Sequence, residues 1–171
     1  MCDEYSIEKH IHRLAAWAAS RAASVIGCRF SVEEGAAILK AIGFKACFSQ
    51  NNLPSPDRVD SKHKEWRTNI IKIAKKNGIK FSHGVAAKLI NCYLKVRFVC
   101  AGEHDNERVK GLHPPVDRQL LGRLAKENIG GHKIEWRKFE RIGWSNFDSE
   151  EYLEVINLIR ESLKGQPLWK I

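Results

Sequence analysis

The lysine at position 88 is the side chain best placed for covalent chemistry. It lies in the segment Gly84–Asn91 (GVAAKLIN), in the second turn of an expected helix. Its helical neighbours, three and four residues away on either side, include no acidic residue. Burial among small and apolar side chains favours the neutral amine, which is a nucleophile toward electrophilic carbon. The alternative is a lysine whose stem packs on the protein while its ammonium reaches solvent.

A carboxylate and a polar loop are the next two candidates. Asp117 follows Pro114 and Pro115, which keep the preceding chain extended, so it is well placed to cap a helix that runs to residue 128. Capping is the structural interpretation, and stabilisation of a developing cation is the catalytic one. The loop Ser49–Asn52 (SQNN) is either an ordinary polar turn or a contact surface.

In this order, the three segments resemble the helix–hairpin–helix DNA glycosylases, the superfamily of endonuclease III and the 8-oxoguanine glycosylases. In its compactness the chain is most similar to the archaeal 8-oxoguanine branch. Gly84–Asn91 is similar to the family's Gly-Val-Gly-x-Lys-Thr-Ala-Asn segment, which makes Lys88 the catalytic lysine. Val116-Asp117 is similar to Val-Asp-Thr-His, which makes Asp117 the catalytic aspartate. The Ser49–Asn52 loop is similar to the family's Ser-x-Gln or Ser-Asn-Asn-Asn loop, which makes Gln50 the wedge that fills the gap left by the extruded base.

The chain departs from the family pattern at several positions. Ala86 replaces the second hairpin glycine, and Arg118-Gln119 replaces Thr-His. The lesion-binding pocket of the family cannot be assigned to residues of this chain. The resemblance implies an all-α, compact helical domain with a helix–hairpin–helix element at about residues 60–99 and a central cleft.

The implied function is excision of a damaged or modified base after the nucleotide rotates out of the duplex. Lys88 would attack C1′ and form a Schiff base, and β-elimination would then cleave the strand, which is AP-lyase activity. Asp117 would stabilise the oxocarbenium-like transition state and move protons. The residues leave the target undecided between an oxidised purine, as in DNA repair, and a bulky modified pyrimidine of foreign DNA, as in phage defence.

Two further groups of residues follow from this interpretation. The candidates for base recognition are aromatic, and their structural alternative is packing in the core: Trp17, Trp66, His113 and Trp144, with His83 in addition. Most candidates for DNA contact are polar or basic, and at the start of the expected 82–99 helix free N–H groups can also bind a phosphate. The candidates are Gln50, Asn51, Asn52, Lys72, Lys75, Lys76, Lys80, Ser82, His83, Gly84 and Arg118.

The charge distribution indicates a phosphate-bearing partner. The chain has 29 Lys and Arg against 20 Asp and Glu, a net charge of +9. Residues 58–80 contain eight basic and two acidic residues, so this segment alone carries a net charge of +6. A one-sided basic stripe is typical of proteins that bind the DNA backbone, whereas the structural alternative is a solvated helix face. A second basic run, Lys133–Arg141, is interleaved with aromatic residues.

The composition predicts one folded domain over residues 1–171. With 43% hydrophobic and 29% charged residues the chain is neither disordered nor fibrous, and its apolar runs are far shorter than the roughly 20 residues needed to span a bilayer. Residues 1–4 (MCDE) do not begin a secretory signal. We expect a monomeric, cytoplasmic protein, nucleoid-associated if the source is prokaryotic, with DNA as partner and without membrane contact.

The five cysteines include no C-x-x-C pair, so we expect no metal, no cofactor and buried reduced thiols. The hydrophobic periodicity is helical almost throughout, which predicts an all-α fold. Expected loops cover residues 51–56 and 101–111, and expected helices cover 6–26, 31–42, 60–76, 82–99, 117–128 and 149–163.

Two other functions fit the same residues. The first is a non-catalytic helical module that binds nucleic acid, in which Lys88 contacts a phosphate and Asp117 is only a cap. The second is a basic protein–protein adaptor. Geometry separates the enzyme from both, because catalysis requires Lys88 and Asp117 to converge in one concave, basic-rimmed site.

Overall fold

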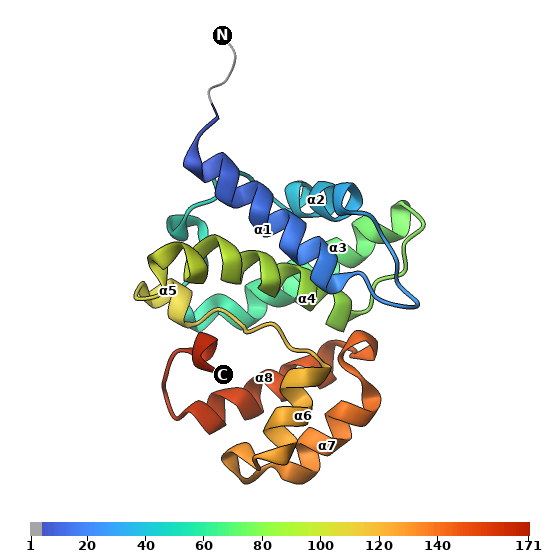
Figure 1. The fold of residues 1–171 in the computed structure, drawn as a ribbon, viewed down its shortest axis with the longest axis vertical. Helices are drawn as coiled ribbons and strands as arrows, with labels where there is room; N and C mark the ends of the chain where they lie inside the picture. The colour runs from blue at the N-terminus through green and yellow to red at the C-terminus, as the bar shows by residue number, and fades with distance from the viewer. Residues whose placement is uncertain (1–4) are drawn as a thin grey trace.

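Helices make up the regular structure of the chain, which a computed structural model describes over residues 5–171 (Figure 1). In this range the only β-type pairing is one isolated bridge between Val25 and Cys28. The predicted all-α class is therefore confirmed. The α-helices are α1 (Ile7–Ala23), α2 (Val32–Ala41), α3 (Val59–Lys76), α4 (His83–Leu94), α5 (Glu107–Lys110), α6 (Arg118–Lys126), α7 (Lys133–Ile142) and α8 (Ser149–Leu163).

Side-chain caps set most helix starts where the sequence predicts them. The Ser6 hydroxyl accepts a hydrogen bond from the Lys9 amide and begins α1. Ser31 and Glu34 form the predicted capping box at α2. Asp148 forms another with Glu151, so α8 has the predicted bounds. These contacts span only three residues, which is why the local sequence is sufficient to predict them.

Two hydrophobic clusters lie on opposite sides of α4. The first is built from α1 to α4 and the segments that follow α4, and the second from α6, α7 and α8, which lie together below α4 in Figure 1. Ala86 belongs to the first cluster and Ala87 to the second, while the Trp144 ring packs against both. Because α4 is buried on both sides, it forms a wall that the two bundles share.

The contact face of α1 consists of alanines, as the sequence predicts, although its register differs from the expected stripe. Ala15, Ala16, Ala19 and Ala23 are buried, and their small side chains permit close packing. The 3.6-residue apolar pattern of residues 6–26 predicts an inner stripe that includes Ile7, Leu14 and Ala15, but Ile7 and Leu14 are exposed. The helix ends at Ala23 and not at residue 26, since the Ser24 hydroxyl bonds to the backbone of Phe30.

The segment after α4 differs from its predicted boundaries. The helix continues as a wider π-helical turn, Lys95–Glu103, which ends at Gly102 with φ of +92°. Residues 101–111 are therefore not one loop, because Asn106 caps the short helix α5. Earlier in the chain, α3 ends at the predicted Asn77-Gly78, and residues 77–82 connect it to α4.

The prediction of buried cysteines is wrong for half of the described thiols. Cys28 is buried and Cys92 partly buried, whereas Cys47 and Cys100 are exposed, and all four are free. Burial raises the pKa of the Cys28 thiol. Cys2 lies outside the described residues, as does the rest of the 1–4 segment. Within residues 5–171, no helix has the length and apolar character that crossing a membrane requires.

Candidate active site

Lys88 of α4 and Asp117, the N-cap residue of α6, meet in an ion pair. The Lys88 Nζ and Asp117 Oδ2 atoms are 2.8 Å apart. The lysine side chain is 6% exposed and the aspartate 39%. Lys88 has no acidic neighbour within its own helix, but the tertiary fold supplies a carboxylate from 29 residues further along the chain. The expectation of an isolated, purely desolvated amine is therefore wrong. The two side chains meet, as the enzyme hypothesis predicts, but not in an open concave cleft.

Asp117 performs two tasks, one with each carboxylate oxygen. Oδ1 accepts from the Leu120 amide at 2.9 Å and caps α6, and Oδ2 binds Lys88. Partial burial raises the pKa of Asp117, but hydrogen bonds from Lys88 and from the backbone amides of Leu120 and Gln119 outweigh this effect and lower the pKa overall. The carboxylate is therefore ionised at neutral pH. The capping role and the pairing with Lys88 coexist.

Trp144 covers the buried end of this pair. The Lys88 Nζ atom lies 5.5 Å from the centroid of the indole ring, in cation–π range. The ring belongs to the connection between α7 and α8, which we call the 143–147 segment. Its position depends on Gly84, because a Cβ there would lie 1.7 Å from the Trp144 carbonyl oxygen. Only glycine permits this close approach.

The 143–147 segment also accepts hydrogen bonds from residues at the start of α4. The Gly84 amide donates to the Phe147 carbonyl at 3.1 Å, and the Ser82 hydroxyl donates to the Ser145 carbonyl at 2.6 Å. The Ser82 oxygen additionally accepts from the Val85 amide. The expectation that Ser82 and Gly84 offer free donors to a phosphate is thus corrected, since both donors already have partners in this conformation.

A narrow crevice adjoins the Lys88 side chain. It is too small to admit a water molecule, so an open central cleft is not found here. The lining residues are Gly84, Ala87, Lys88, Asn91, Val116, Trp144, Phe147 and Tyr152.

Of the aromatic candidates for base recognition, only Trp144 lies against Lys88. Trp66 is a core residue, 4% exposed, with its ring edge-on to Phe44. Trp66 therefore packs in the core, which is the structural alternative to base recognition. Trp17 is 53% exposed on α1 and lines no part of the crevice. His113 is buried in a separate polar network.

The basic candidates gather at one end of α3. Lys72, Lys75, Lys76 and Lys80 are all exposed. Arg118 is exposed immediately after Asp117. Arg67 does not belong to this stripe, because it is buried, lies over the Tyr152 ring and contacts the Nδ1 atom of His83 at 3.1 Å. His83 is partly buried, and burial together with Arg67 lowers the pKa of its imidazole.

The Gln50–Asn52 turn lies elsewhere. Asn51 and Asn52 are exposed and Gln50 is partly buried. The Asn52 side chain accepts from the Ser49 amide at 2.8 Å, so it stabilises its own turn. The next carbonyl, of Leu53, accepts from Arg108 of α5. In Figure 1 this teal turn lies on the left, beside the end of the α4 extension and away from the start of α4.

A buried polar network fills the space between the two hydrophobic clusters, and no local pattern predicts it. Asn91, one helical turn after Lys88, donates to the Pro114 carbonyl and to the Tyr152 hydroxyl, both at 2.9 Å. Its Oδ1 atom therefore accepts from His63 Nε2, at 2.7 Å. The other ring nitrogen of His63 accepts from Arg67 Nε. Burial holds the pKa of His63 well below its usual range, so this ring is neutral.

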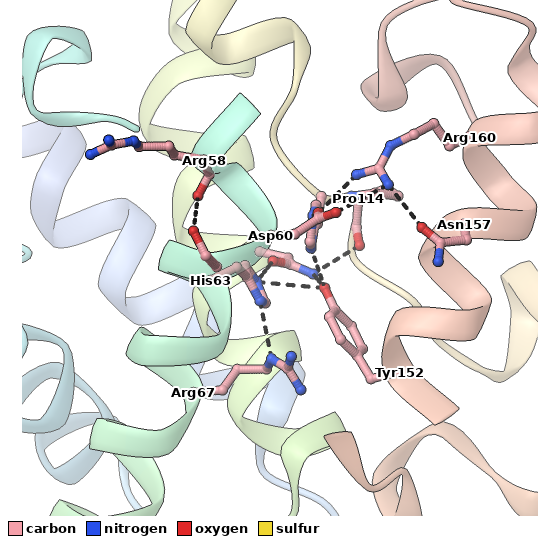
Figure 2. A network of polar contacts seen from close by, with 11 residues as sticks. Arg58, Asp60, His63, Arg67, Pro114, Tyr152, Asn157 and Arg160 are labelled. Atoms are coloured by element: carbon pink, nitrogen blue, oxygen red, sulfur yellow. Dashed lines mark hydrogen bonds and ion pairs between the residues drawn. The ribbon is translucent and has the colours of Figure 1, made fainter. Parts of the chain in front are cut away.

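The second half of the network leads to α8. The Tyr152 hydroxyl donates to His113 Nδ1 at 3.0 Å, and His113 Nε2 donates to Asp60 at 2.8 Å. Arg160 binds the same carboxylate. Figure 2 shows Tyr152 and Arg160 reaching from α8 toward the α3 side chains. Burial lowers the pKa of His113 although Asp60 acts in the opposite direction, and the His113 hydrogen bond holds the pKa of Asp60 far below its usual range despite partial burial.

Stability should fall as the pH decreases below about 6.5, where an unfolded histidine gains a proton. The folded protein keeps His63 and His113 neutral, so the unfolded state binds more protons and acid favours unfolding. The expected loss is up to about 1.4 kcal/mol per pH unit for each buried ring. Urea unfolding between pH 7 and 5 measures it. A flat wild-type profile would contradict the neutral assignment.

No group of three or more His, Cys, Asp or Glu side chains in residues 5–171 could hold a metal ion. Residues 5–171 thus form a compact all-helical protein, and its candidate site pairs a buried lysine with a partly exposed aspartate. No family model, curated protein or solved structure matches the chain.

Proposed function

We propose that this protein is a DNA glycosylase that excises a damaged or modified base and uses Lys88 as its amine nucleophile. One observation carries the proposal, which is the 2.8 Å contact between Lys88 and Asp117. These are the two residues that the glycosylase resemblance assigns to catalysis. We further propose that α3, residues 77–82 and α4 serve as the DNA-binding helix–hairpin–helix element.

Burial of Lys88 favours the enzyme over a passive DNA-binding module. A lysine that contacts phosphate must expose its ammonium, but Lys88 is 6% exposed and already holds a carboxylate. Removing such a pair from water is costly, and apolar side chains in its place are often equally stable or more so. Stability is therefore a weak explanation for this buried pair, and a functional role for Lys88 is the explanation that we propose.

The ionised pair can perform the reaction without an additional co-reactant. As the glycosidic bond breaks, the base leaves with the bonding electron pair and takes a proton from the Lys88 ammonium. The Asp117 carboxylate stabilises the positive charge that develops on the sugar. The freed amine then bonds to C1′, and opening of the sugar ring yields the imine. The Asp117 carboxylate then takes the C2′ proton, and the 3′ phosphate leaves with its bonding electron pair, which breaks the strand.

Access to the amine requires a conformational step. Asp117 is partly exposed, whereas Trp144 and the narrow crevice cover Lys88. The incoming nucleotide would therefore reach Asp117 first and displace the indole ring. Exclusion of water from the crevice protects the imine from premature hydrolysis.

Trapping of the imine tests the proposal directly. The probes are duplexes that carry a single abasic site, an 8-oxoguanine or a glucosylated hydroxymethylpyrimidine. Borohydride added during incubation should reduce the imine and link protein to DNA, and peptide mass analysis should locate the link at Lys88. Absence of an adduct on the whole panel, together with unchanged strands, would exclude the lyase mechanism. Base release without an adduct would indicate that water is the nucleophile.

DNA affinity should fall steeply with salt, because the lysines at the end of α3 displace counterions from the phosphate backbone. Changing Lys72, Lys75 and Lys76 to Gln should make the slope of log K against log salt shallower by up to about 2.7, or roughly 0.9 per lost phosphate contact. Titrations of an undamaged duplex measure the slope. The matched control removes three exposed lysines elsewhere: Lys40, Lys45 and Lys170. Equal slopes for both variants would show that α3 does not face DNA.

A further inference from the structure

Ile26 is the most exposed large hydrophobic side chain in the described chain, at 89%. It lies at the tip of the turn between α1 and α2. Reciprocal backbone hydrogen bonds between Val25 and Cys28, at 3.2 and 3.0 Å, close this turn, and Gly27 adopts φ of +88°. The side chain is therefore presented to solvent from a short, closed turn. Proteins that kink DNA insert exposed apolar side chains, isoleucine among them, as wedges between base steps.

The Ile26 turn borders the candidate active site. A groove of about 310 Å³ is lined by residues 25–28, by the residues at the start of α4 and by Ser145 and Asn146. Ser82 and Ser145, which are hydrogen-bonded to each other, both line it. The Phe30 and Phe81 rings, with centroids 4.9 Å apart, hold the turn against this segment. In Figure 1 the blue loop after α1 lies on the right, beside the start of α4 and the orange connection of α7 to α8.

The charges around the groove suit a phosphate backbone. Lys80 lines the groove itself, and Arg29 is exposed on the same turn. Lys75 and Lys76 lie exposed at the adjacent end of α3. None of the groove-lining residues is acidic. A duplex held by these basic side chains would place one base step against Ile26. The neighbouring nucleotide would then lie near the 143–147 segment that covers Lys88.

We propose that Ile26, and not Gln50, is the wedge that enters the duplex when the base is extruded. The proposal rests on the proposed function, because a wedge is needed only if a nucleotide leaves the helix. Gln50 is less suited to this task, since its turn packs beside α5 and lines no part of the groove. The partner recognised by Ile26 is a duplex opened at one base step.

The test compares affinity for two duplexes of the same sequence, one intact and one with a single tetrahydrofuran site as a stable abasic analogue. Wild-type protein should prefer the tetrahydrofuran duplex, in which a base is already missing. Ile26→Ala should reduce this preference about tenfold while leaving the affinity for the intact duplex unchanged. Ile26→Leu should retain the preference, because leucine provides a similar apolar volume. The controls are Gln50→Ala and Leu14→Ala, the latter at another exposed apolar position.

The outcomes separate the wedge from the enzyme. If Ile26→Ala keeps the full preference, or if Gln50→Ala loses it, the inference is wrong even when wild-type protein forms the Lys88 adduct. If wild-type protein neither prefers the tetrahydrofuran duplex nor forms an adduct, the inference and the proposed function fail together. Thermal unfolding of each variant checks the fold, which removal of an 89% exposed side chain should not disturb.

Discussion

Lys88→Gln should abolish both the borohydride adduct and strand cleavage, with a loss of at least about 10³-fold in the cleavage rate. Glutamine has no amine that can form an imine, but it is a comparable helix former and its amide can still donate to Asp117. The fold should therefore survive, because Asp117 is partly exposed and still caps α6. Single-turnover gels with the abasic duplex measure the effect.

A second lysine of the same region provides the control. Lys95 immediately follows α4 and does not contact Asp117, so Lys95→Gln should retain the adduct and the cleavage rate. Full activity of Lys88→Gln, with an adduct at another amine, would show that the motif alignment is wrong at its central residue. Loss of cleavage with base release preserved would assign the glycosylase step to water and leave Lys88 only the lyase step.

Asp117→Asn should lower the rate of base release about 10² to 10³-fold, because a neutral amide cannot stabilise the cationic sugar as a carboxylate does. Binding of an intact duplex should remain nearly unchanged, since Asp117 is not a phosphate contact. Asparagine caps helices about as well as aspartate, so α6 should persist. Quantification of the released base, together with thermal unfolding, separates catalysis from stability.

The chain contains a matched control for this substitution. Asp148 caps α8 in a similar manner and forms no ion pair with Lys88, so Asp148→Asn makes the same chemical change at a helix start that is not bonded to the lysine. It should leave base release unaffected. A stable Asp117→Asn protein that releases the base at the wild-type rate would remove Asp117 from the mechanism and leave it only the cap.

The 143–147 segment links the candidate site to the packing of the two bundles. It contacts the start of α4 through Gly84 and Ser82, and its Trp144 ring lies over Lys88 while packing against both hydrophobic clusters. A movement that uncovers the amine must therefore break hydrogen bonds at the start of α4. Such breakage would free the Gly84 amide, the donor that the sequence interpretation assigned to a phosphate.

The features that the sequence determined by itself are those that depend on near neighbours. Ser31 with Glu34 and Asp148 with Glu151 begin their helices through bonds that span three residues, so their positions follow from residue type and spacing. Asp117 is predicted as a cap for the same reason. Helical periodicity similarly predicts the all-α class.

Tertiary structure alone decided which side chains face one another. The acidic partner of Lys88 lies 29 residues away, and the partners in the buried network are separated by up to 100 residues. Periodicity can mark Trp66 as apolar, but only packing shows that it faces the core while Trp144 faces Lys88. Local hydrogen bonds define the ends of a helix, whereas the chemical environment of a side chain depends on which other helix packs against it.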